Sequence, residues 1–445
     1  MTTKLNYKQM KFYNRKKEIA LLQKIENKSR STAQMTFMLG RRRIGKTSLL
    51  VKATQDYKTL YFFVSKKSEP LLCKEFIDEI RNKLGVEIFG ELKSFKDVFG
   101  YLMDLSTKQH FTLIIDEFQE FSSINSSIYS EMQNIWDSKK NQSSINLLLC
   151  GSVYSLMSKI FENSKEPLFG RATSRIYLKA FNINTLKEIL SDFHPEYTKE
   201  DLLAFYLVTG GVAKYVEMLV EEACFTRQDM ISYVFSENSL FIDEGKNVLI
   251  DEFGKDYGNY FSILSLIASS KTSRVEIESV LEINIGGFLN RLENDYGLIE
   301  KVKPIFSKPN SRSIKYQIKD NFLNFWFRFI YKHRSAVEIG NIEYIKTIVD
   351  RDYKVYSGRI LEKYFTDKMM QEGIYSNINT YCEKCNENEI DIVAVNDYEK
   401  RLVIAEVKRN KAKIKMNILQ EKASSLIKNF NKYSIEYIPL SLDEM

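Results

Sequence analysis

The chain of 445 residues has few of the residues that build flexible linkers, and it has no long apolar run. Only six Pro and 18 Gly are present, which argues against long linkers and predicts domains that pack directly on one another. No apolar run approaches the ~20 residues that span a bilayer. The polar opening, MTTKLNYKQMKFYNRKK, lacks the apolar core of a signal peptide. We therefore expect a cytoplasmic protein without a membrane partner.

The cysteines and the net charge bear on the redox state of the protein and on its contact with nucleic acid. Of five cysteines, only Cys382 and Cys385 form a CxxC pair, with no second pair and no nearby histidine pair. This favours a reduced protein over a zinc site or a disulfide framework. Lys and Arg number 65 against 58 Asp and Glu, a formal charge of +7 that permits nucleic-acid contact without indicating it. The length predicts about two to four domains, each able to bury a core.

A strand, a glycine-bounded loop and a helix are predicted in MTFMLGRRRIGKTSLLVKA. The loop satisfies G-x4-G-K-[ST], and its glycines allow backbone N–H groups to face phosphate oxygens at the positive end of the helix dipole. Lys46 is expected to reach the β- and γ-phosphates, and the Thr47 hydroxyl to ligate Mg²⁺. The residues expected to surround ATP are Gly40, Arg41, Arg42, Arg43, Ile44, Gly45, Lys46, Thr47 and Ser48.

Acidic and polar residues follow two further predicted strands. FTLIIDEF ends with Asp116 and Glu117 at the carboxyl end of the strand, where ligands gather in open α/β sheets. Asp116 would hold Mg²⁺, and Glu117 would orient or deprotonate the attacking water. INLLLCGS ends at Ser152, near the expected γ-phosphate. PLFGRATSRIYLKAF offers Arg171 or Arg175 to neutralise the transferred phosphoryl group, although each can equally be a surface charge.

Six segments, FYNRKKEIALL, GRRRIGKTSLL, LIIDEFQEF, IWDSKKNQSSINLLLCGS, PLFGRATSRIYL and TGGVAKYVE, together resemble the archaeal-type P-loop ATPases. These are AAA+ and STAND-related proteins that carry a C-terminal nuclease-like domain. The resemblance implies an α/β fold with an ASCE-type parallel sheet, an inserted central strand and a helical lid after Phe181. It places residues 12–18 near the adenine and the family's Gly-Arg on Gly170 and Arg171. The chain departs from the family at Ala213, where the lid motif usually has Pro.

The middle of the chain is predicted to be helical, and then to form a winged helix. LLAFYLVTGGVAKYVEMLVEEA has helical spacing, and the stretch from YFSILSLIASS to IKYQIKD predicts three short helices and a two-stranded wing. The candidate recognition helix is nearly neutral, with Asn290 and Arg291 beside Glu293 and Asp295. The wing is more basic, with Lys301, Lys303, Lys308, Arg312 and Lys315. DNA binding and protein contact both remain open. We interpret the aromatics of DNFLNFWFRFIYKHR as helix core rather than as a base-stacking surface.

Near its end, the chain reads EIDIVAVNDYEKRLVIAEVKRN, which predicts a β-hairpin with a turn at Asn396–Asp397. Glu406 and Lys408 share one face of the second strand, and Asp391 lies near the same end of the hairpin. Carboxylates there suit a second Mg²⁺ or Mn²⁺, and the metal with Lys408 could activate a water.

This arrangement is similar to the PD-(D/E)XK nuclease core, an α/β restriction-endonuclease-like fold. The resemblance places Asp391, Glu406 and Lys408 on its motif positions and Glu362, from GRILEKYFTDKM, on its helical acid. Ile390 stands where the family name has Pro. The alternatives are an ordinary hairpin that carries charges at a sheet edge and an inactive version of this fold.

These segments divide the chain into a P-loop ATPase core (1–180), a helical lid (181–255), a winged helix domain (256–335) and a nuclease-like domain (336–445). The first hypothesis is an ATP-hydrolysing AAA+/STAND-like switch, coupled to a nuclease-like domain directed at DNA. The second is a STAND-like signalling or scaffold ATPase that assembles into a homo-oligomer, with an inactive C-terminal domain for protein contacts. A third, a transcription regulator, requires sequence-specific DNA binding by the winged helix.

Overall fold

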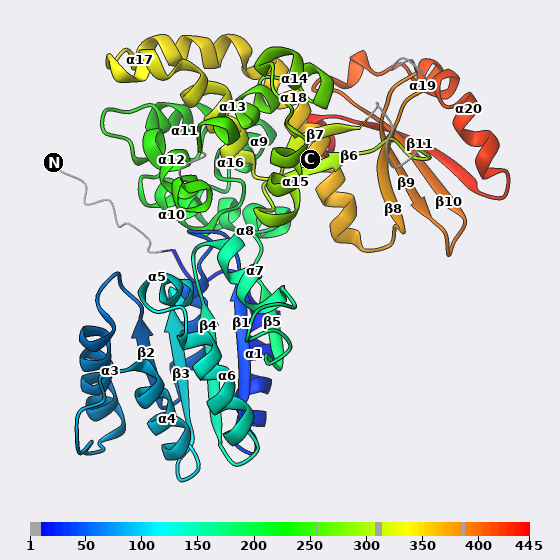
Figure 1. Cartoon of the computed structure of the whole chain (residues 1–445). Coiled ribbons are helices and arrows are strands. Elements are labelled where there is room, and N and C mark those ends of the chain that lie inside the picture. Colours follow the sequence, from blue (N-terminus) through cyan, green and yellow to red (C-terminus); the bar gives the residue numbers. More distant parts are fainter. Residues whose placement is uncertain (1–9, 255–256, 308–313, 384–387) are drawn as a thin grey trace. The chain divides into compact units, whose positions relative to one another are not determined.

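The structure is a computed structural model that describes residues 10–254, 257–307, 314–383 and 388–445 (Figure 1). The chain forms two compact units, one of residues 13–180 and one of residues 181–445 with the described residues before 13. Cys385 of the CxxC pair, and Lys308 and Arg312 of the predicted wing, lie outside the described residues. No helix of the described part has the length and apolarity to cross a bilayer.

A five-stranded parallel sheet forms the centre of the first unit, with strand order β2-β3-β4-β1-β5. Its strands are β1 (Gln34–Leu39), β2 (Thr59–Phe63), β3 (Phe111–Asp116), β4 (Ile145–Cys150) and β5 (Ser174–Tyr177). Every residue of β1, β3 and β4 is buried, as expected for parallel strands covered on both faces. Because β4 lies between β1 and β3, the expected parallel sheet with an inserted central strand is confirmed.

Two helical layers cover this sheet (Figure 1). The helices are α1 (Lys16–Ser29), α2 (Lys46–Thr54), α3 (Glu69–Leu84), α4 (Phe95–Leu105), α5 (Phe121–Ile124), α6 (Ile128–Lys139) and α7 (Tyr154–Glu162). Successive strand residues point to opposite layers. Ile114 and Leu148 pack with α1 and α2, whereas Leu113 and Leu147 pack with α3, α4, α6 and α7. The loops at the carboxyl ends of the strands are therefore carried by a core that is packed on both faces.

The second unit begins with helices in the region where the sequence predicts a lid. They are α8 (Ile183–Phe193), α9 (Lys199–Thr209), α10 (Ala213–Glu221), α11 (Arg227–Val234) and α12 (Leu240–Phe253). Next come α13 (Tyr257–Ala268), α14 (Arg274–Leu281), α15 (Gly286–Asn290) with a π-helical turn (Arg291–Asp295), and an antiparallel pair, β6 (Ile299–Val302) and β7 (Lys315–Ile318).

The aromatic stretch after β7 is buried helix. It forms α16 (Asn321–Phe325), a π-helical segment (Trp326–Ile330), and then α17 (Arg334–Glu338). Phe322, Phe325, Trp326 and Phe329 are each at most 3% exposed. Their rings contact one another and neighbouring helices, so the interpretation as helix core is confirmed.

A four-stranded sheet ends the chain, after the long helix α18 (Ile342–Glu372). Its order is β11-β10-β9-β8: β8 (Asn377–Tyr381), β9 (Ile390–Asn396) and β10 (Arg401–Val407) pair antiparallel, and β11 (Ser434–Leu440) pairs parallel to β10. Between β10 and β11 lie α19 (Met416–Lys422) and α20 (Ser424–Ile427), whose apolar residues pack on the sheet.

The predicted hairpin of β9 and β10 is present, but its turn is longer than expected. Asn396 pairs with Arg401, so the connection comprises residues 397–400 rather than a turn centred on Asn396–Asp397. The Asn396 side chain accepts a hydrogen bond from the Glu399 backbone N–H at 2.9 Å, which closes this longer turn. The longer turn leaves the strand assignments of Asp391 and Glu406 unchanged.

Candidate functional site

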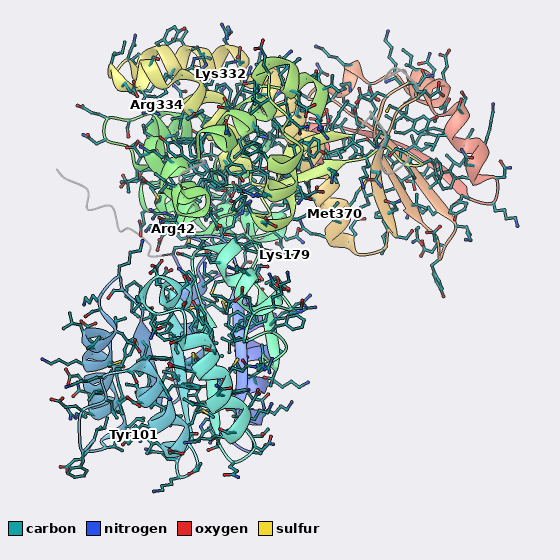
Figure 2. The ribbon with its side chains drawn as sticks, in the orientation of Figure 1. Arg42, Tyr101, Lys179, Lys332, Arg334 and Met370 are labelled. Carbon is teal, nitrogen blue, oxygen red and sulfur yellow. The ribbon has the colours of Figure 1, made fainter. Side chains whose placement is uncertain are left out.

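The loop 40–47 joins β1 to α2 at the carboxyl edge of the first sheet, where Figure 2 labels Arg42. Arg43 and Gly45 have positive φ values of 68° and 91°, which curl the backbone just before α2 begins at Lys46. The buried Lys46 ammonium donates to the carbonyl oxygens of Gly40 at 2.7 Å and Arg41 at 2.9 Å. The backbone of the loop therefore surrounds the Lys46 side chain.

Asp116, the last residue of β3, accepts four hydrogen bonds. The Thr47 hydroxyl and the Tyr61 hydroxyl donate to Oδ2 at 2.8 and 2.6 Å. The Cys150 thiol at 3.0 Å and the Glu117 backbone N–H at 2.9 Å donate to Oδ1. Burial, together with the neighbouring Asp116 charge, raises the pKa of both Tyr61 and Cys150, so both remain donors. The structure thus brings Thr47 and Asp116 together as predicted and fixes the carboxylate from both flanking strands.

Glu117 lies next to this carboxylate with a positive φ of 55°, which is uncommon for a residue with a side chain. Its Oε2 accepts from the Ser152 hydroxyl at 2.7 Å, the Ser152 backbone N–H at 3.2 Å and the Gln119 amide at 2.6 Å. A Cβ on Gly151 would lie 1.9 Å from Gln119 Oε1, so a larger residue there would displace the Gln119 amide from this position. Ser152, which the sequence predicts near the γ-phosphate, contacts Glu117, and neither this contact nor Gln119 was predicted.

The two predicted arginines have other described contacts. Arg171 forms an ion pair with Asp137 of α6 at 3.2 Å and donates to the Phe169 carbonyl at 2.9 Å. The Arg175 guanidinium lies 5.6 Å from the centre of the Tyr177 ring. Neither of these described contacts joins an arginine to Asp116 or Glu117.

Arg15 is a further residue that the sequence did not single out. Its buried guanidinium donates to the Ile44 carbonyl of the loop at 3.4 Å and pairs with Glu18 at 3.6 Å. Burial lowers the pKa of this guanidinium. Arg15 therefore links the segment before α1 to the loop 40–47.

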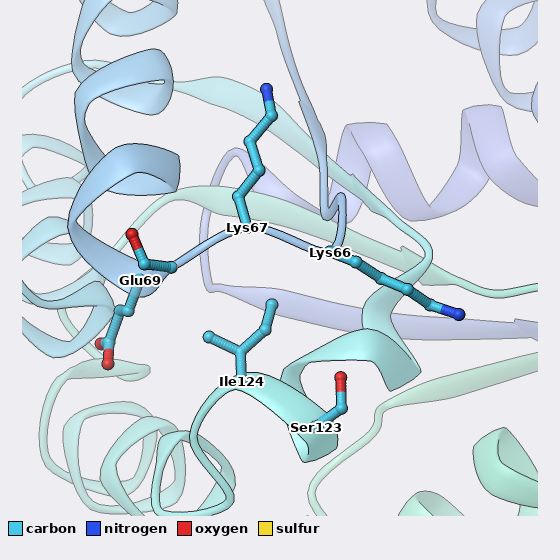
Figure 3. Close-up of a pocket in the computed structure, with 6 residues that line it drawn as sticks. Lys66, Lys67, Glu69, Ser123 and Ile124 are labelled. Atoms are coloured by element: carbon cyan, nitrogen blue, oxygen red, sulfur yellow. The ribbon is translucent and has the colours of Figure 1, made fainter.

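An open pocket of about 450 Å³ follows β2 and β3, lined by Lys66, Lys67, Ser68, Glu69, Ser123 and Ile124 (Figure 3). Glu69 accepts from the Phe95 backbone N–H at 2.7 Å and from Asn125 at 2.8 Å, so it serves to join helices. Lys67 pairs with Glu75 at 2.5 Å. None of the predicted site residues lines this pocket.

A second cluster of charged residues lies on the C-terminal sheet. The Lys408 ammonium lies 3.1 Å from Asp391 Oδ2 and 2.9 Å from Glu406 Oε1, so it bridges the two carboxylates. The Val407 backbone N–H donates to Asp391 Oδ2 at 2.8 Å. Lys422 of α19, which was not predicted, lies 3.4 Å from Glu406 Oε2. The predicted convergence of Asp391, Glu406 and Lys408 is present.

Glu362, on α18, faces the same cluster. Burial and the Asp391 charge raise the pKa of Glu362 to about 8, whereas Lys408 opposes this shift. Across the residues that the structure describes, no three His, Cys, Asp or Glu side chains are grouped as metal ligands. The expectation of a second Mg²⁺ or Mn²⁺ at these acids therefore gains no support from their geometry.

We expect the stability of the fold to fall as the pH rises through about 8, because Glu362 is protonated in the folded chain below that pH. In the unfolded chain a glutamate ionises near pH ~4.3. Between these values the folded state binds the additional proton, and the free energy of unfolding decreases as pH increases. Between pH 6 and pH 9, the free energy of unfolding measured with denaturant should decrease less in Glu362→Gln than in the unsubstituted chain. An unchanged pH dependence in Glu362→Gln, or the same change in the exposed control Glu372→Gln, would contradict this account.

Comparison with known proteins gives two family matches. Residues 12–219 match an ATPase domain predominantly from Archaea, and residues 326–425 match a family of archaeal and bacterial proteins of unknown function. An uncharacterised protein of Methanocaldococcus jannaschii is 27% identical over 407 residues, which cover 89% of this chain and 87% of the relative.

Solved structures are similar at lower identity. A Walker-type ATPase of Pyrococcus abyssi is 17% identical with a TM-score of 0.54, over 71% of this chain and 96% of its own. The ORC2 protein of Aeropyrum pernix is 16% identical with a TM-score of 0.47, over 77% of this chain and 96% of its own. At this identity the Pyrococcus likeness bears on the fold alone.

Proposed function

Because the chain belongs to the archaeal-type ATPases and is an ATP-hydrolysing enzyme with a second family domain behind its ATPase domain, we propose that ATP turnover at the loop 40–47 controls DNA cleavage by the C-terminal domain. The proposed DNA cleavage is supported by one observation: the Lys408 ammonium bridges the carboxylates of Asp391 and Glu406.

At the ATP site, the loop N–H groups and Lys46 would hold the phosphates. The donor set of the Thr47 hydroxyl and the Asp116 carboxylate, 2.8 Å apart, fits the oxygen ligands that Mg²⁺ prefers. Bound Mg²⁺ would neutralise charge on the phosphate oxygens. Tyr61 and Cys150 would keep Asp116 directed at this position through their hydrogen bonds.

Glu117 would orient or deprotonate the attacking water, and Ser152 would hold Glu117 in place and sense the γ-phosphate. Gln119 is a second holder of the same carboxylate oxygen. Arg171 would act on the developing charge only after leaving Asp137, in its own site or in that of another copy.

Helices α8–α12 would form the lid, and α13–α15 with β6 and β7 have the element order of a winged helix. Two of the described wing lysines are already paired: Lys301 contacts Glu293, and Lys315 lies 2.8 Å from Glu389. We therefore propose that the winged-helix-like module positions neighbouring parts of the chain, and we assign it no contact with DNA bases.

The C-terminal region supports a nuclease-like fold through its order of elements. A helix precedes three antiparallel strands, and two short helices lead into a fourth strand parallel to the third. Lys408 would stabilise charge at the scissile phosphate while Asp391 and Glu406 position the attacking water. Glu362 would complete the cluster from α18.

We expect the purified full chain to cleave plasmid or oligonucleotide DNA with ATP and Mg²⁺ or Mn²⁺, and Lys408→Ala to lower the cleavage rate by about 10²-fold or more. Gel analysis of time courses measures this loss. Lys400→Ala, in the turn at the other end of β10, is the matched control and should cleave normally. Absence of cleavage by the unsubstituted chain, or equal cleavage by Lys408→Ala, would remove the nuclease role.

A second candidate function is a scaffold ATPase in which the C-terminal domain serves protein contacts only. It is favoured by the ammonium groups of Lys408 and Lys422, which already compensate Asp391 and Glu406. Mass measurement with and without ATP distinguishes the two. An oligomer that forms only with ATP, in protein that ignores DNA, supports the scaffold; DNA-stimulated ATP turnover counts against it.

A further inference from the structure

Arg409, the residue directly after Lys408, is held by groups from two helices. Its guanidinium donates to Glu200 Oε2 on α9 at 2.5 Å and to the Ser357 hydroxyl on α18 at 2.6 Å. The guanidinium carbon lies 5.7 Å from the centre of the Tyr353 ring. Lys408 and Arg409 therefore anchor one short stretch of chain to the charged cluster and to α9, respectively.

This arginine site combines buried and partly exposed groups. Ser357 is fully buried and Tyr353 is 1% exposed, while the side chains of Arg409 and Glu200 are 20% and 30% exposed. Arg227 lies 4.9 Å from the centre of the Tyr353 ring, so two guanidinium groups pack on one aromatic side chain. A planar guanidinium can serve Glu200 and Ser357 at once, which the single ammonium of a lysine does less well.

The pair joins the two segments that match known families. Glu200 lies within residues 12–219, which match the ATPase domain, whereas Arg409 and Ser357 lie within residues 326–425, which match the second family. Both segments of the contact belong to the same compact unit. Helix α18 also carries Glu362, one of the titratable residues around Lys408.

We propose that Arg409 is the positioning residue through which α9 moves Lys408 relative to Asp391 and Glu406. The inference rests on the proposed function, in which α9 belongs to the lid, and it requires that the lid shift with the nucleotide state. Adjacent Cα atoms are about 3.8 Å apart, so a displacement of Arg409 is passed directly to Lys408. Coupling of this kind is reciprocal: whatever occupies the Lys408 cluster changes nucleotide affinity by the same factor.

The link is tested by hydrogen exchange in the full chain, with and without a slowly hydrolysed ATP analogue. In the unsubstituted chain, ATP should change the exchange rate of residues 401–410 by about 5-fold or more, the lower range of measured couplings. Arg409→Gln and Glu200→Gln should each abolish this response. Arg401→Gln removes another Arg–Glu pair from the other end of β10, the contact with Glu436 at 3.0 Å, and should keep the response.

A charge exchange separates transmission from simple support of the fold. Glu200→Arg combined with Arg409→Glu restores the ionic link in reverse, and the ATP response should return. Thermal unfolding checks that each variant is folded, and Glu200→Gln, a change on a part-exposed helix residue, keeps the test available if Arg409→Gln is unfolded. A double variant that stays unresponsive overturns the proposal.

The outcomes also separate this inference from the nuclease function. If ATP changes exchange in 401–410 and Arg409→Gln removes the change, the link holds even where no DNA is cleaved. If DNA is cleaved but Arg409→Gln and Glu200→Gln respond to ATP as the unsubstituted chain does, the link is wrong and the nuclease function survives. An unsubstituted chain without any ATP response overturns the link as well.

Discussion

Replacing Glu117 with glutamine is expected to slow ATP turnover by about 10²–10⁴-fold, the usual contribution of a general base, while ATP binding stays close to normal. Glutamine keeps the shape that Ser152 and Gln119 hold, but it no longer attracts the proton of the attacking water. Phosphate release under steady state measures turnover, and a titration with fluorescent ATP measures binding. Loss of turnover with binding retained places the effect on the chemical step.

Glu120 provides the matched control for this substitution. It lies three residues further along the chain, where its carboxylate contacts Lys66 at 4.0 Å and accepts a longer hydrogen bond from the Gln119 amide at 3.5 Å. Glu120→Gln should turn over ATP at the normal rate. If Glu117→Gln also does so, the assignment of Glu117 to the water is wrong, and another group must activate it.

The parts of both sites that the sequence predicts are those set by local spacing. The two glycines, the lysine and the threonine of the motif predict the phosphate-binding loop and the helix after it. The contact between Thr47 and Asp116 is predicted because both residues lie at the carboxyl edge of a parallel sheet. Glu406 and Lys408 converge because alternate residues of a strand share a face. These arguments need only the chain near each motif.

The supporting residues could not be predicted in this way. Tyr61 and Cys150 reach Asp116 because β2 and β4 flank β3, and the order of the strands has to be known before either residue becomes a candidate. Arg409 and Glu200 are 209 positions apart, and no local pattern joins them. Arg171 illustrates the opposite case, since its spacing fits a catalytic arginine while its described partner is Asp137.

Lys46→Ala is expected to raise the dissociation constant for ATP by about 100-fold or more. Each hydrogen bond between a charged group and its partner contributes about 1.5–3 kcal/mol. The lost ammonium would serve oxygens of two phosphates, and about 1.4 kcal/mol corresponds to a tenfold change in affinity. The substitution also leaves the Gly40 and Arg41 carbonyls without their described lysine donor. Titration with labelled ATP and Mg²⁺ measures the change.

Lys52, in the last turn of the same helix, separates the local role of Lys46 from the general effect of positive charge on α2. It is exposed and contacts Gln55 at 3.0 Å, so Lys52→Ala should bind ATP normally. Lys46→Ala that remains folded yet binds ATP within about threefold of normal, a difference of only ~0.7 kcal/mol, would mean that the loop 40–47 does not grip the phosphates. The roles assigned to Thr47, Asp116 and Glu117 would then lose their common ligand, because all three are defined by where the loop places the γ-phosphate.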